Sequence, residues 1–122
     1  KVLYTYLYTL VSMITTNGIV EINKKFDKGI IVNRSSLEFA LSMILTTKDL
    51  FRQLACIVRA ILIDHVFEEG NKRTAAAIIV YYFEENKIAY DPYKIDKIIV
   101  DIIKNNINST EHIRRKLKDV IR

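Results

Sequence analysis

The residues best suited to chemistry gather in one short stretch, HVFEEGNKRTA, at positions 65–75. The stretch contains one of the chain's 2 histidines and one of its 3 glycines, together with two acids, an asparagine and two bases. His65 brings an imidazole, the side chain most often used as a general base near neutral pH. Glu69 brings a carboxylate, which Mg²⁺ takes together with phosphate oxygens and water. For both residues a plainer interpretation stays open: an idle histidine at a helix end and a solvated acid.

Apolar residues at helical spacing lie on both sides of this stretch, and Gly70 interrupts the pattern. We therefore expect the backbone N–H groups of Gly70, Asn71 and Lys72 at the start of a helix, where unpaired donors and the helix dipole favour an anion. Gly70 also lets backbone approach a ligand closely. The Asn71 side chain is either a donor to a phosphoryl oxygen or a capping residue.

Lys72 and Arg73 fall in the first turn of that helix, where a cation is unfavourable by roughly 0.3–1 kcal/mol. A bound phosphate would reverse the sign, although Glu68 and Glu69 could also neutralise the turn. A base, a metal-binding carboxylate, backbone donors and an arginine within one loop are what phosphoryl and nucleotidyl transfer require. No serine lies in the loop, so a serine nucleophile is not indicated.

The stretch resembles the signature of the Fic/Doc (Fido) family, written H-P-F-x-D/E-G-N-x-R. The resemblance implies that His65 deprotonates a hydroxyl on a target protein and that Glu69 holds the Mg²⁺ of ATP. It also implies that Gly70, Asn71 and the backbone of Lys72 form an anion hole, while Arg73 pairs with the terminal phosphates. Phe67 is expected to anchor the loop in the core.

Three positions depart from the family pattern. Val66 replaces the usual proline, Ala76 replaces a second arginine of AMP-transferring members, and Lys72 replaces their second glycine. The string GNKRTA is similar to the Doc branch, the toxins of toxin–antitoxin pairs. That branch implies transfer of the ATP γ-phosphate to a Ser or Thr hydroxyl, with a translation factor as the expected target. Protein AMP transfer and a degenerate Fic-fold binding module stay open as alternatives.

The family's inhibitory pattern, S/T-x-x-x-E-G/N, is missing, because no Ser or Thr has a Glu four residues later. A separate antitoxin chain or a missing segment would have to supply inhibition. The net charge of +5 fits a lysine-rich surface, and without a dense basic block no nucleic-acid partner is predicted. A single cysteine, Cys56, excludes a disulfide framework. No apolar run reaches the ~18 residues that span a membrane, and a cytoplasmic location is expected.

The predicted fold is all-α: one Fic-type domain over residues 1–122, with about six helices and a short β-hairpin flap at about 18–33. The flap would clamp the target by strand addition. Asn17-Gly18 is expected to end a first helix, and Ser35 with Glu38 forms a capping-box pattern. The helices are predicted at about 2–16, 35–46, 73–86, 91–106 and 109–121, with a further one that starts at Thr47 or Asp49 and ends at about 62. Asp91-Pro92 and Ser109 are later start signals.

Overall fold

The computed structural model describes residues 15–122 of the 122-residue chain. This part is all-α and contains six helices with no strand: α2 (Thr16–Asn23), α3 (Arg34–Ile44), α4 (Leu50–Leu62), α5 (Asn71–Glu85), α6 (Pro92–Lys104) and α7 (Thr110–Lys118). The helix predicted over residues 2–16 lies almost wholly outside the described residues. None of the described helices combines the length and the apolar character needed to cross a membrane.

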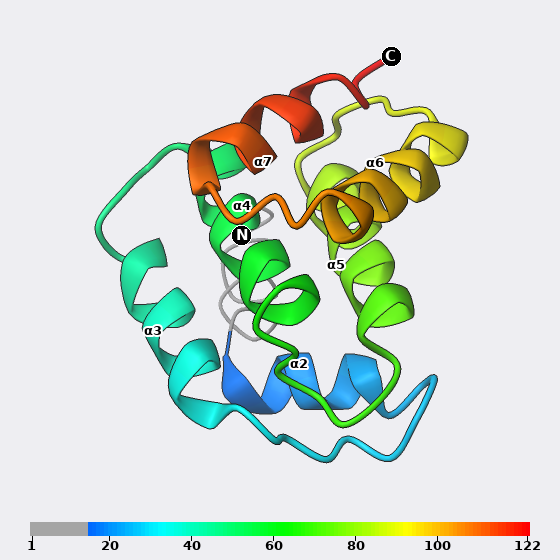
Figure 1. Cartoon of the computed structure of the whole chain (residues 1–122). Helices are drawn as coiled ribbons and strands as arrows, with labels where there is room; N and C mark the ends of the chain where they lie inside the picture. Colours follow the sequence, from blue (N-terminus) through cyan, green and yellow to red (C-terminus); the bar gives the residue numbers. More distant parts are fainter. Residues whose placement is uncertain (1–14) are drawn as a thin grey trace, which may run out of the picture.

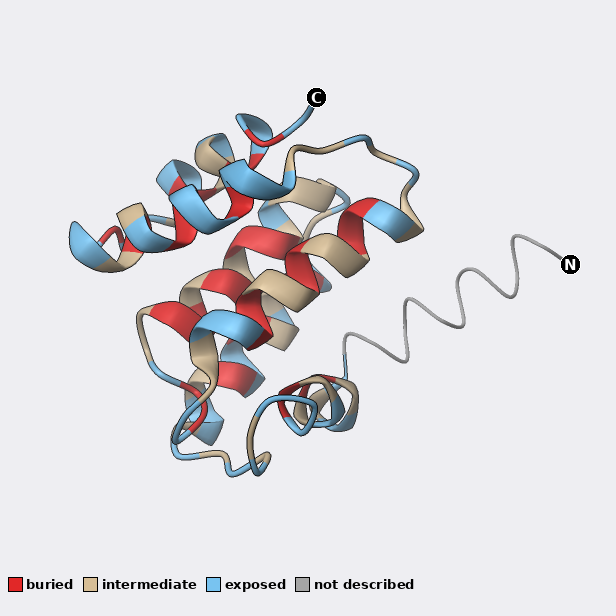
Figure 2. Cartoon of the chain, turned by 90° about the vertical axis from the view of Figure 1, so that its right-hand side faces the viewer, coloured by how far each residue is buried: buried red, intermediate tan, exposed pale blue. Residues whose placement is uncertain are grey.

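Helix α4 is the hub of the packing and contacts α3, α5, α6 and α7. Its apolar residues recur every three or four positions, so that Leu54, Ile57, Val58 and Ile61 are all fully buried. Helix α5 lies beside α4 and is also packed against α2 and α6 (Figure 1). Buried residues follow the sides on which these helices face one another, as Figure 2 shows. The start of α5, where the candidate loop ends, is thereby held by the core.

Side-chain caps fix where most helices begin. Asp91 precedes Pro92 at the start of α6 and Ser109 caps α7, both as predicted. Of the two start residues predicted for α4, Asp49 is the one that accepts hydrogen bonds from the N–H groups that open the helix. The capping-box prediction for Ser35 is wrong. Asn33 caps α3 instead, because its Oδ1 accepts from the N–H of Ser36 while its Nδ2 is anchored on the carbonyl of Asp64 at 3.0 Å.

The β-hairpin predicted for residues 18–33 is wrong, since its first half is helical. Thr15 caps α2 by accepting a hydrogen bond from the N–H of Gly18 at 3.0 Å, so Asn17-Gly18 opens a helix rather than ending one. Ile19 and Asn23, four positions apart, are buried on one face of this helix. Burial at helical spacing outweighs the β preference of the branched residues between them.

The second half of the predicted flap is extended, but it pairs with the candidate loop. The N–H of Val32 donates to the carbonyl of Val66 at 2.8 Å, and the N–H of Glu68 donates to the carbonyl of Ile30 at 3.0 Å. The pairing amounts to an isolated antiparallel bridge between Ile31 and Phe67. Residues 30–33 therefore lie along residues 66–68, where the sequence predicted a separate hairpin.

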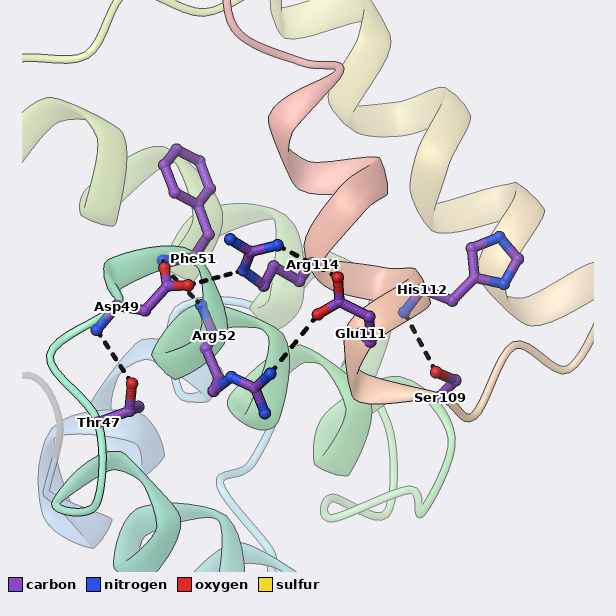
Figure 3. A network of polar contacts seen from close by, with 8 residues as sticks. All are labelled: Thr47, Asp49, Phe51, Arg52, Ser109, Glu111, His112 and Arg114. Carbon is purple, nitrogen blue, oxygen red and sulfur yellow. Dashed lines mark hydrogen bonds and ion pairs between the residues drawn. The ribbon is translucent and has the colours of Figure 1, made fainter.

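A charged network joins the N-terminal end of α4 to α7, whereas the candidate loop follows the C-terminal end of α4. Arg114 Nε donates to Asp49 Oδ2 at 2.7 Å, and Arg114 Nη1 lies 3.2 Å from Glu111 Oε1. Arg52 completes the row with an ion pair of 3.6 Å to Glu111 (Figure 3). Partial burial raises the pKa of Asp49, but the hydrogen bonds from Arg114, Arg52 and Phe51 and the Arg114 charge outweigh it and lower that pKa below its usual range.

Candidate functional site

The loop between α4 and α5 takes its shape from two left-handed residues and two buried ones. Gly70 has φ +79° and ends the loop directly before α5, as the sequence predicted. His65 has φ +50°, a conformation that few non-glycine residues adopt. Val66 and Phe67 are buried, which confirms Phe67 as the anchor. Glu68 and Glu69, which lie between this buried pair and Gly70, are exposed.

The peptide before His65 is held firmly from three sides. The Asp64 carboxylate accepts a hydrogen bond from Ser36 Oγ at 2.6 Å and an ion pair from Arg59 Nη1 at 2.9 Å. The Asp64 carbonyl accepts from Asn33 Nδ2. These contacts fix the backbone from which the exposed His65 side chain projects.

One pocket of about 490 Å³ opens at this loop and at the start of α5. All six residues predicted as site residues line it: His65, Glu69, Gly70, Asn71, Lys72 and Arg73. The rest of its wall comes from elsewhere in the chain: Phe26, Asp27, Leu62 and Ile103. The fold thus brings the predicted base, the predicted metal-binding carboxylate and the predicted anion-binding groups around a single hollow.

The start of α5 carries donors that no described residue uses. The N–H groups of Gly70, Asn71, Lys72 and Arg73 make no hydrogen bond within residues 15–122, and Gly70 provides no side-chain cap. Lys72 and Arg73 are exposed and form no ion pair with the described residues. Among the described residues, Glu68 and Glu69 therefore do not neutralise Lys72 or Arg73 by forming ion pairs with them.

The Asn71 side chain is already occupied by the loop. Its Oδ1 accepts from the N–H of Phe67 at 3.1 Å, and its Nδ2 donates to the carbonyl of Phe67 at 2.8 Å. The predicted capping role is not realised, because this amide bonds to the Phe67 backbone rather than to the N–H groups that open α5. What Asn71 offers to the pocket is its backbone N–H.

The two carboxylates that line the pocket, those of Glu69 and Asp27, are suited to Mg²⁺. No group of three or more His, Cys, Asp or Glu side chains within residues 15–122 could hold a metal. Mg²⁺ needs no such cage, because one or two carboxylates, phosphate oxygens and water complete its shell. Glu69 and Asp27 both line the pocket and could supply those carboxylates to Mg²⁺ arriving with a nucleotide.

Four residues that line the pocket, Phe26, Asp27, Leu62 and Ile103, were missed by reasoning from the sequence. Phe26 and Asp27 follow α2 and lie far from the candidate loop in the chain, and no sequence motif reveals that they line the pocket. An adjoining apolar hollow of about 460 Å³ shares Phe26 and Arg73 with the pocket and runs along α5 past Ala76 and Val80. Asn23, at the end of α2, is fully buried and bonded to the loop.

The resemblance to the Fic/Doc family rests on residues 65–73 and stays a prediction. Comparisons of the chain with protein-family models, with curated proteins and with solved structures find no match.

Proposed function

We propose that this protein is a Doc-like transferase that uses Mg·ATP to phosphorylate a hydroxyl side chain of a target protein, in the manner of a toxin of a toxin–antitoxin pair. A translation factor is the proposed target, the cytoplasm the proposed location, and a separate antitoxin chain the proposed inhibitor. The observation that carries the proposal is the pocket itself. His65, Glu69 and Arg73 line the same hollow as Gly70, Asn71 and Lys72, whose backbone N–H groups have no hydrogen-bond partner within residues 15–122.

Each proposed role follows from a position in that pocket. The donors of Gly70, Asn71 and Lys72 would bind the γ-phosphate, with Arg73 neutralising the neighbouring phosphate. Glu69 would hold Mg²⁺, which neutralises phosphate charge when bound. His65 would accept the hydroxyl proton as the target oxygen bonds to the γ-phosphorus, while the bond from that phosphorus to the β–γ bridging oxygen breaks and ADP leaves. The adjoining apolar hollow offers room for the rest of the nucleotide.

The segment 30–33 supports docking of an extended target. Its pairing with residues 66–68 uses the carbonyl of Ile30 and the N–H of Val32, whereas the N–H and carbonyl of Ile31 have no partner among the described residues. Ile30 and Val32 are 42% and 60% exposed. An added strand could pair with Ile31 and cover both side chains, which would bring its hydroxyl towards His65.

Two isotope labels test the proposal. ATP labelled on the γ-phosphate or on the α-phosphate is supplied with the protein to a cell extract, and labelled proteins are identified by mass spectrometry. Label from the γ-phosphate alone, lost with His65→Ala, supports phosphorylation. Label from the α-phosphate indicates AMP transfer instead. Nucleotide binding without transfer of either label indicates a degenerate binding module and contradicts the proposal.

A further inference from the structure

One buried side chain outside the loop ties both walls of the pocket together. Asn23 is completely buried and uses every polar group of its amide. Its Nδ2 donates to the carbonyl of Glu69 and to Thr74 Oγ1, both at 3.0 Å, and its Oδ1 accepts from the N–H of Gly29 at 2.8 Å. These three partners lie in the candidate loop, in α5 and in the segment after α2.

The contact with Glu69 bears directly on the proposed anion site. No peptide bond of the described chain is cis, and in a trans peptide the C=O and N–H groups point in opposite directions. Because the carbonyl of Glu69 points at Asn23, the N–H of Gly70 in the same peptide points away from it. That N–H makes no hydrogen bond to residues 15–122 and stays available to a ligand.

The Glu69–Gly70 peptide needs a hydrogen bond to hold its orientation, because glycine can adopt more backbone conformations than other residues. Rotation of the Glu69–Gly70 peptide changes ψ of Glu69 and φ of Gly70, and glycine accepts both signs of φ. Without the bond from Asn23, the peptide could turn its carbonyl outward and present a negative dipole where the phosphate is expected. Close packing adds to the restraint, since a Cβ on Gly70 would lie 3.0 Å from Asn23 Nδ2.

The same residue also places the opposite wall. The backbone carbonyl of Asn23 accepts from the N–H groups of Phe26 and Asp27 at 2.9 and 2.8 Å, and both of these residues line the pocket. The distance between the Phe26–Asp27 wall and the Glu69–Gly70 wall is therefore set through one residue.

We infer that Asn23 is a positioning residue for phosphate binding, which aims the N–H of Gly70 and fixes the width of the pocket. The inference rests on the proposed function, because that function supplies the phosphate. Asn23 itself touches no reacting atom. Thr74 provides a matched control: Thr74→Val removes a hydrogen bond of the same asparagine but leaves its bond to Glu69.

The test is binding of Mg·ATP and of inorganic pyrophosphate by calorimetry to the wild type, Asn23→Ala and Thr74→Val, each first shown to be folded. We expect Asn23→Ala to lower the affinity for Mg·ATP and for pyrophosphate at least tenfold and by the same factor. The affinities of Thr74→Val should stay within twofold of those of the wild type. Equal binding by Asn23→Ala, or equal losses in the two variants, would overturn the inference while leaving the proposed function standing. A wild type that binds neither probe contradicts both.

If Asn23→Ala does not fold, the inference is tested on the wild type by following its amide signals in NMR. The Gly70 amide signal should move downfield as pyrophosphate is added, while the Asn23 side-chain amide signals stay in place. A Gly70 signal that does not move while that of Lys72 does would overturn the inference.

Discussion

Asn71 and Phe67 form a closed pair, in which the asparagine side chain both accepts from the Phe67 N–H at 3.1 Å and donates to the Phe67 carbonyl at 2.8 Å. The pair locks the last turn of the loop onto the first residue of α5. Phe67 is buried, so neither of its backbone groups can turn to water if the asparagine is lost. The asparagine thus has a structural reason to occupy this position, whatever the pocket binds.

We expect Asn71→Ala to lower the free energy of unfolding by about 1–3 kcal/mol, since it leaves two buried backbone groups without partners. Urea denaturation measures the change. Asn105→Ala is the control, because the exposed side chain of Asn105 bonds, among the described residues, only to Asp101, and its loss should cost less than about 0.5 kcal/mol. Equal losses in the two variants would refute the structural role of Asn71.

Gly70 and Gly18 should respond to alanine with opposite signs. Gly70 has φ +79°, and an added Cβ would meet Asn23 Nδ2 at 3.0 Å and Asp27 Cβ at 3.2 Å. The left-handed backbone alone costs alanine about 1–2 kcal/mol. Gly18 lies inside α2 without a positive φ, so Gly18→Ala should stabilise by about 0.5–1 kcal/mol. Thermal unfolding of the two variants compares them, and a tolerated Gly70→Ala would contradict the described loop.

How much the sequence can foretell differs between local and long-range features. Asp49, Asp91 and Ser109 cap helices through bonds to N–H groups two or three residues away, so their pattern is legible in the chain. The start of α5 is also predictable from the sequence, because Gly70 interrupts the local helical pattern directly before it. Residues 19–22 and 30–32 look β-branched and extended, yet burial against other helices makes the first helical and contact with residues 66–68 makes the second a bridge.

The site shows the same division. The six predicted residues are contiguous or nearly so, and they line one pocket because a short loop can hardly separate them. Asn23 reaches the Glu69 carbonyl from 46 positions away, and nothing in local spacing announces a contact of that range. Asn71 was open to two interpretations because a sequence does not reveal where an amide points.

The Asp49–Arg114 contact predicts a loss of stability in acid. The pKa of Asp49 is lower in the folded state than in the unfolded chain, so its contribution is fully present above the unfolded pKa of about 3.9. The contribution is lost as the pH falls through the lower folded pKa. Arg114→Met should therefore reduce the free energy of unfolding at pH 7 and flatten its decline towards pH 3, as followed by urea denaturation.

A variant of the acid separates the charge from the cap. Asparagine caps helices as well as aspartate does, so Asp49→Asn should keep α4 capped while removing the titrating group. Its stability should depend less on pH below 5 than that of the wild type. An unchanged acid profile in both variants would show that other carboxylates control acid unfolding.

Tyr82 is the one buried side chain among the described residues whose polar atom has no hydrogen-bond partner. Burial, and to a smaller extent the neighbouring Cys56, raises the pKa of its hydroxyl far above the ordinary value, so the group stays neutral. A buried donor without a partner costs about 1–3 kcal/mol, and Tyr82→Phe should recover part of this as about 1 kcal/mol of added stability in urea.

Tyr90→Phe is the matched control, because the Tyr90 hydroxyl donates to Glu84 Oε2 at 2.9 Å. That variant should be neutral or slightly less stable, and a Tyr82→Phe variant that loses more stability than Tyr90→Phe would mean that the Tyr82 hydroxyl has a partner after all.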